Sequence, residues 1–229
     1  MGAGVPELIE RILELRGISA EGLDEFLTPS IRDLAPSREL PNVDAAAEVI
    51  LAAVRAVIFD QWDRAAPHGM GDVKVGGNYA AGIFAHEKAK KEGWPVELYL
   101  DAKTHKYVEE FATSNFAGIT KDGVYVTPDS CSVLPSVTNM SLRQCAKDLG
   151  IKVEVRPVPY TEIKKFQAVA ALGTAVVITP VWEITRGREV IKVSDPNVVH
   201  PTLQKLYDRV QGIQYGLVKD THKWCFEVK

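Results

Sequence analysis

The sequence predicts a mixed α/β domain (α+β class) preceded by a small helical segment. From residue 77 onward, stretches that alternate like strands are interspersed with stretches of helical periodicity. The chain has 229 residues, of which 46% are hydrophobic, and this is enough to bury a large core. Residues 1–56 differ from the rest, because they contain five arginines, ten acidic residues and no lysine. We therefore expect an acidic helical segment over 1–56 and the α/β domain over 57–229.

The overall composition excludes several classes of protein. Lys and Arg number 27 against 30 Asp and Glu, which excludes a disordered polyelectrolyte and predicts no nucleic-acid partner. No apolar run reaches the ~18–20 residues that span a bilayer, so no membrane association is expected. The N-terminus carries acidic residues where a signal peptide carries basic ones. Because the three cysteines have no paired spacing, we expect a reduced, cytoplasmic protein.

In the N-terminal segment, the spacing of apolar residues predicts three helices. The first begins near Val5 and ends at Gly17, and the second covers about 20–27. The third begins after Asn42, a good N-cap residue, and continues to about residue 56. Residues 57–72 are rich in Gly, Pro and charge, which predicts a loop.

Beyond residue 77 helices and strands alternate. Helices are expected over 79–92, 138–149 and 202–215, and strands over 96–102, 114–119, 124–127, 152–157, 176–184 and 189–193. The first hairpin turns at Lys121–Gly123, and the second turns at Arg186–Arg188.

Two stretches carry candidate reactive groups. Lys74 precedes two glycines and a predicted helix in VKVGGNYA. Two glycines allow close backbone approach, so this lysine is a candidate for an amine that forms a Schiff base, although a solvated surface lysine is the other interpretation. Glu109 and Glu110 are adjacent in YVEEFATSNF (107–116), where the chain is also expected to be extended as a strand, so one should face inward. That carboxylate could hold a cationic ring nitrogen, or both acids could be solvated.

Two further stretches are candidate anion sites. Ser136 precedes a predicted helix, so Val137 and Thr138 present N–H groups at its positive end. Residues Gly173–Ala175 form a small-residue turn whose N–H groups suit a phosphate or a carboxylate. Both features have ordinary alternatives, namely bound water and close packing. An amine, a carboxylate and two anion sites are what pyridoxal phosphate requires.

At these spacings the chain resembles the C-terminal, cofactor-binding part of the branched-chain amino acid aminotransferases, a fold-type IV pyridoxal phosphate family. The resemblance extends from about Asp63 to Val228. One departure is Ser136, which stands where the family commonly has glycine. The motifs that carry the resemblance are Lys74–Tyr79 (KVGGNY), Glu110 with Thr113 and Asn115, Leu134–Thr138 (LPSVT), Gly173–Ala175, and Ile213–Gly216 (IQYG) with Trp224.

The resemblance implies roles for three residues around the cofactor ring. Lys74 would form the Schiff base and, once released, would move the proton between the substrate Cα and the cofactor C4′. Tyr79 would donate a hydrogen bond to the phenolate oxygen of the cofactor. Glu110 would pair with the pyridinium nitrogen and so keep the ring an electron sink.

The resemblance also implies the residues that bind anions. Val137, Thr138 and Thr174 would bind the cofactor phosphate, mainly through backbone N–H groups. Thr113, Thr174 and Ala175 would contact the substrate, with Thr174 and Ala175 holding its carboxylate. No metal-binding residues are expected.

The N-terminal part departs from this family. Family members have a small domain before the lysine, which supplies an arginine to the phosphate and much of the substrate side-chain pocket. Only 73 residues precede Lys74 here, and most of them do not resemble that domain. Residues 8–56 bear a weaker resemblance to the N-terminal region of RecJ-like DHH-family exonucleases. The aspartate-rich metal motif that should follow is absent. We therefore expect 1–56 to be a helical appendage without chemistry.

As a whole, the resemblance implies an enzyme that transfers an amino group between leucine, isoleucine or valine and 2-oxoglutarate. It also implies a role in amino-acid biosynthesis, amino acids and 2-oxo acids as substrates, and a homodimer. Without the small domain, we expect cofactor binding roughly ten- to a hundred-fold weaker and impaired turnover. The alternatives are a catalytically inactive binding module and a chimeric fragment with a RecJ-like appendage.

Overall fold

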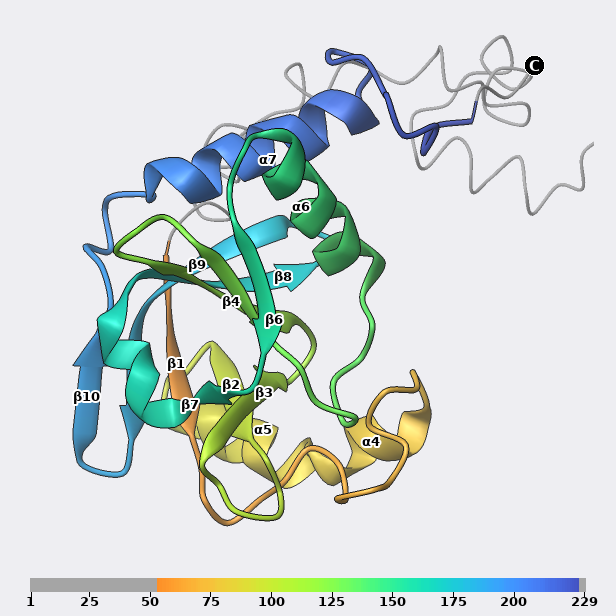
Figure 1. Ribbon diagram of the computed structural model, residues 1–229. Coiled ribbons are helices and arrows are strands. Elements are labelled where there is room, and N and C mark those ends of the chain that lie inside the picture. Colours follow the sequence, from red (N-terminus) through yellow and green to blue (C-terminus); the bar gives the residue numbers. More distant parts are fainter. Residues whose placement is uncertain (1–52, 227–229) are drawn as a thin grey trace, which may run out of the picture. The chain divides into compact units, whose positions relative to one another are not determined.

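The computed structural model describes residues 53–226 (Figure 1). The first two predicted helices, most of the third, and the RecJ-like resemblance of residues 8–56 lie outside these residues. The elements are β1 (Val54–Ile58), α4 (Gly76–Ala81), α5 (Ile83–Lys91), β2 (Val96–Leu100), β3 (Tyr107–Phe111), β4 (Asn115–Thr120), β5 (Tyr125–Pro128), α6 (Val137–Asp148), β6 (Val153–Arg156), β7 (Val158–Pro159), the 3₁₀ helix η4 (Tyr160–Lys165), β8 (Phe166–Gly173), β9 (Val177–Arg186), β10 (Glu189–Lys192) and α7 (Pro201–Gln214).

The ten strands form one mixed sheet in which six strands close a circuit. The order is β6-β5-β4-β8-β9-β1-β2-β3-β7, and β10 pairs with β9. Strand β3 also pairs with β4 through Glu110 and Asn115, so β4, β8, β9, β1, β2 and β3 return to their starting point. Strand β1 is parallel to both of its neighbours, whereas β3, β4, β8 and β9 follow one another antiparallel. The candidate site residues on β3 and β4 therefore lie where the circuit closes.

Two hydrophobic cores lie on opposite faces of this sheet. On β4, Phe116 belongs to one core, and Ala117 and Ile119 belong to the other, as expected for side chains that alternate along a strand. The first core is shared by the six strands of the circuit. The second core packs under α6 and α7, which lie side by side in Figure 1, and includes Leu142 and Leu206. This packing of α6 and α7 holds the start of α6 against the sheet.

The predicted elements after residue 90 agree closely with the structure. Helices α6 and α7 each begin one residue before the expected start, and both predicted hairpins form, β4–β5 and β9–β10. Gly123, Gly150 and Gly187 adopt positive φ at the predicted turns or helix end. Among residues 53–226, no helix is long and apolar enough to cross a membrane.

Two expectations about secondary structure are wrong, and one strand was not expected. Residues 54–58, expected as the end of a helix and the start of a loop, form strand β1, because this stretch pairs with β2 and β9 and its last three residues are buried. The sheet therefore begins before the predicted boundary at 56/57. The expected helix over 79–92 is divided at Gly82 into α4 and α5. Strand β8 was missed, since the Ala-rich stretch FQAVAALG shows no clear alternation and is held extended by β4 and β9.

Candidate active site

The predicted site residues meet in a cavity of about 280 Å³. It lies between the end of β3, the start of β4, the turn between β8 and β9, and the start of α6. The loop between β1 and α4 lines it from another side. Of the residues singled out in the sequence, the cavity is lined by Lys74, Tyr79, Glu110, Thr113, Val137 and Thr174.

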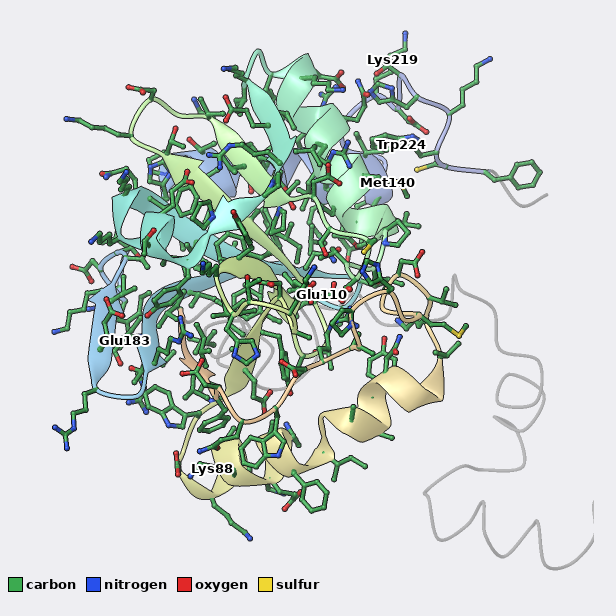
Figure 2. All side chains as sticks on the ribbon, turned by 60° about the horizontal axis from the view of Figure 1, so that its bottom comes forward. Lys88, Glu110, Met140, Glu183, Lys219 and Trp224 are labelled. Atoms are coloured by element: carbon green, nitrogen blue, oxygen red, sulfur yellow. The ribbon has the colours of Figure 1, made fainter. Side chains whose placement is uncertain are left out.

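Glu110 presents a buried carboxylate to this cavity. It is 5% exposed, and Figure 2 shows it near the middle of the described part, whereas Lys88 and Lys219 lie at the periphery. Its Oε2 accepts a hydrogen bond from Nδ2 of Asn115 at 2.6 Å, and its Oε1 lies 3.0 Å from Nε of Arg64. The N–H of Leu134 also points at Oε1, at 3.5 Å. Burial raises the pKa of Glu110 to about 7, and Arg64 opposes this rise.

Glu109 is also buried, so the expectation that only one of the two acids faces inward is wrong, as is the solvated alternative. It is 3% exposed, and its Oε1 accepts a hydrogen bond from Oγ of Ser130 at 3.0 Å. Burial raises the pKa of Glu109, and the hydrogen bond from Ser130 opposes this rise. Glu109 does not line the cavity, because neighbouring residues on a strand point to opposite faces.

Lys74 lines the cavity from an exposed loop two residues before α4. The loop is held by Asn78, whose Nδ2 donates to the carbonyl oxygens of Met70 at 2.7 Å and Val73 at 2.8 Å. The two glycines after Lys74 form the first turn of α4, and a Cβ at either position would meet no atom within 4 Å. No protein atom of the described part comes close to these two glycines, whereas a close approach of backbone occurs earlier, at Gly71.

The start of α6 is the first candidate anion site. Ser136 is the N-cap, and its Oγ accepts a hydrogen bond from the N–H of Asn139 at 3.2 Å. Val137 is 73% exposed, and the first N–H groups of a helix have no acceptor within the helix. Together with the helix dipole, these N–H groups favour an anion in the cavity.

The second candidate anion site is the turn that begins after β8. Gly173 and Thr174 line the cavity, whereas Ala175 and Thr138 do not. Ala175 is exposed in the same turn, and Thr138 is the second residue of α6. The roles of Thr138 and Ala175 therefore stay predictions.

Several lining residues had no role assigned from the sequence, among them Arg64, Leu134 and Ser136. Arg64 and Leu134 contact Glu110, and Ser136 caps α6 beside the cavity. A Ser at the start of a helix is a recognisable capping signal, but nothing local marks Arg64 as a buried arginine. Its burial follows from contacts with distant parts of the chain.

The donor set of the cavity fits pyridoxal phosphate. The cofactor needs an amine, a carboxylate near its ring nitrogen, a donor to its phenolate oxygen and N–H groups for its phosphate. Lys74, Glu110, Tyr79 and the start of α6 are of these chemical types and face one cavity. A cationic ring N–H would also lower the raised pKa of Glu110, because a neighbouring positive charge stabilises the ionised carboxylate.

Comparisons with known proteins define the family. The model for "Amino-transferase class IV" matches residues 15–184. The chain belongs to this class IV aminotransferase family. One similar protein is the branched-chain-amino-acid aminotransferase of Helicobacter pylori, which is 44% identical over 73% of this chain and 48% of its own length. The branched-chain-amino-acid aminotransferase of Haemophilus influenzae is 42% identical over 75% of this chain and 52% of its own length. Aminotransferase poxL of Penicillium oxalicum is 42% identical over 76% of this chain and 50% of its own. The chain thus spans about half the length of these relatives.

The fold is also that of solved branched-chain aminotransferases. The Escherichia coli enzyme aligns with a TM-score of 0.68 and 29% identity, over 78% of this chain and 56% of that one. The enzyme of Thermoproteus uzoniensis, solved with norvaline, aligns with a TM-score of 0.63 and 26% identity, over 72% and 52%. A further branched-chain aminotransferase, complexed with N-(5'-phosphopyridoxyl)-L-glutamate, aligns with a TM-score of 0.66 and 25% identity, over 77% and 56%. The expected fold-type IV architecture of the C-terminal domain is confirmed.

Proposed function

We propose that this chain is the cofactor-binding part of a pyridoxal phosphate-dependent branched-chain amino acid aminotransferase, which transfers an amino group between leucine, isoleucine or valine and 2-oxoglutarate. The observation that carries the proposal is that Lys74, the buried Glu110 and the N-terminus of α6 line one cavity. The names of the similar proteins support the substrate class.

Each residue then has a task set by its chemistry. When bound, pyridoxal phosphate stabilises the negative charge that develops at the substrate Cα. Lys74 would hold the cofactor through its amine and, when free, move the proton between Cα and C4′. Glu110 would keep the ring nitrogen protonated, Tyr79 would donate to the phenolate oxygen, and N–H groups at Val137 and Thr174 would bind the phosphate.

We extend the proposal to the partners and the cell compartment. Thr113 would contact the amino acid or 2-oxo acid, since it lines the cavity beside Glu110. A homodimer is supported by exposed apolar side chains on α5, where Ile83 is 57% and Phe84 is 74% exposed. All three cysteines are free, which suits a cytoplasmic role in amino-acid biosynthesis.

The test is chemical labelling of the cofactor lysine. The full chain would be saturated with pyridoxal phosphate, reduced with borohydride and mapped by peptide mass spectrometry, and we expect the label on Lys74. The Lys74→Ala variant should lose it, whereas Lys88→Ala, a change at a partly exposed lysine of α5, should keep it. A label at another lysine, or none on a folded sample, would contradict the proposal.

A second assay tests the reaction itself. Formation of glutamate from 2-oxoglutarate should depend on valine, leucine or isoleucine, and should be lost in Lys74→Ala. Labelling of Lys74 without any transfer would support the inactive binding module instead.

A further inference from the structure

Arg64 is a buried arginine whose guanidinium contacts three separate segments. It lies in the loop after β1 and is 6% exposed. Its Nε lies 3.0 Å from Oε1 of Glu110. Its Nη2 donates to the carbonyl oxygen of Gly71 at 3.0 Å and also to that of Ser132. One cation therefore joins the loop that carries Lys74, strand β3, and the loop that leads into α6.

The contact between two of these segments leaves no room for a side chain. A Cβ at Gly71 would lie 2.7 Å from Cα of Ser132 and 2.9 Å from Cβ of Ala65. Real Cβ atoms do not approach other atoms this closely, so glycine is required at position 71 for the two loops to touch. Lys74 follows Gly71 by three residues, so the position of its backbone depends on this contact.

The charge of Arg64 also acts directly on Glu110. The other charged and titratable groups near this carboxylate are Glu109 on its own strand and, across the cavity, Lys74 and Tyr79. Glu109 favours the protonated form of Glu110, as burial does, whereas Arg64 favours the ionised form. An arginine keeps its charge throughout the physiological pH range.

We propose that Arg64 is a positioning residue of the transamination site, which holds the Lys74 loop against Glu110 and supplies a positive charge that favours the ionised form of Glu110. The inference rests on the proposed function, in which an ionised Glu110 is the partner of the ring nitrogen. A lysine would preserve the charge, but it lacks the planar guanidinium with which Arg64 contacts Glu110, Gly71 and Ser132 at the same time. The two parts of the role can therefore be separated by substitution.

The first measurement follows the ionisation of Glu110 in the cofactor-free protein. Infrared spectra of the carboxyl group would be recorded against pH and assigned by difference from Glu110→Gln. In Arg64→Met we expect the titration midpoint to rise by at least about one pH unit. Arg64→Lys should return the midpoint close to the wild-type value, and Arg188→Met, at an exposed turn residue, should not move it. An unchanged midpoint in Arg64→Met would overturn the proposal.

The second measurement follows the position of the Lys74 loop. Limited proteolysis between residues 65 and 75 should become at least about tenfold faster in both Arg64→Met and Arg64→Lys. Local unfolding of this loop costs less free energy once the contacts of the Arg64 guanidinium are lost. Arg188→Met should be cut at the wild-type rate. If Arg64→Met does not fold, the Arg64→Lys variant provides the test. Proteolysis of Arg64→Lys at the wild-type rate would show that the guanidinium of Arg64 does not hold the Lys74 loop.

The proposed function can fail separately. If wild-type protein carries no cofactor on Lys74, the proposed function is wrong, while the two cofactor-free measurements still report on Arg64. If wild-type Lys74 is labelled but Arg64→Met shows the wild-type midpoint and cleavage rate, only the inference about Arg64 is wrong. The expected combination is labelling of wild-type Lys74 together with both changes in Arg64→Met.

Discussion

At the scale of single residues, the site depends on two adjacent glutamates with different surroundings. Glu110 faces the cavity and contacts Arg64, whereas Glu109 is hydrogen-bonded to Ser130 and does not line the cavity. Both carboxyl groups are buried, so each costs free energy in its ionised form. Only Glu110 lines the cavity, where contact with a cationic ligand would offset this free energy.

The raised pKa of Glu110 predicts a specific dependence of stability on pH. Burial raises this pKa from 4.5 to about 7, so within that window the folded protein holds a proton that the unfolded chain has released. The free energy of unfolding therefore falls as pH rises through the window. Glu110→Gln should remove a fall of roughly 1–3 kcal/mol, measured by urea unfolding at several pH values. The control is Glu87→Gln at an exposed position of α5, and an equal fall in Glu110→Gln and wild type would refute the assignment.

Substitution of the two glutamates should also separate their functions. If Glu110 is the partner of the ring nitrogen, Glu110→Gln should retain the cofactor on Lys74 but lower the turnover number by about 100-fold or more, because a neutral ring is a poorer electron sink. Glu109→Gln should affect turnover far less, since Glu109 does not line the cavity. The check is single-turnover kinetics with valine. Comparable losses in both variants would mean that the two acids act as one unit.

At the scale of elements, the cavity is built from the ends of strands and the start of one helix. The loop between β1 and α4 is held by Asn78, and the start of α6 is capped by Ser136. Leu142 and Leu206 pack α6 and α7 into the core under the sheet. The fold itself therefore orients the backbone N–H groups at the start of α6.

Removal of the N-cap should weaken both stability and anion binding. Ser136→Ala loses the hydrogen bond to the N–H of Asn139 and should lower the free energy of unfolding by about 1 kcal/mol. Ser141→Ala, within α6, is the matched control and should cost less. Thermal unfolding measures the first effect, and the affinity for pyridoxal phosphate, measured by fluorescence, should fall in Ser136→Ala alone. Equal melting temperatures for the two variants would contradict this role of Ser136.

At the scale of the whole described part, the sheet depends on a strand that begins before the predicted domain boundary. Strand β1 joins β9 to β2 and so completes the circuit of six strands. Ala56 is fully buried in the core that these strands share. A cut at the predicted boundary would therefore remove part of the sheet.

Two truncations test this position of β1. Removal of residues 1–56 deletes Val54–Ala56, three of the five residues of β1, whereas removal of 1–52 leaves the strand intact. We expect the shorter product to melt several degrees lower, because a 1–2 kcal/mol loss shifts the melting temperature by about 2–8 °C. Circular dichroism during heating makes the comparison. Equal melting temperatures would show that β1 contributes little and would restore the predicted boundary.

By itself, the sequence determined the elements whose signals are local, and it also located the residues of the cavity by their order along the chain. Helices α6 and α7, the two hairpins and the glycine turns were predicted because periodicity and turn residues are properties of neighbouring positions. Only the tertiary structure decided that residues 54–56 and 166–173 are strands, because pairing on both sides overrides a weak local preference. It also decided that Glu109 and Arg64 are buried. The contact of Arg64 with Ser132 joins residues 68 positions apart, and a local sequence pattern does not predict a contact between residues so far apart in the chain.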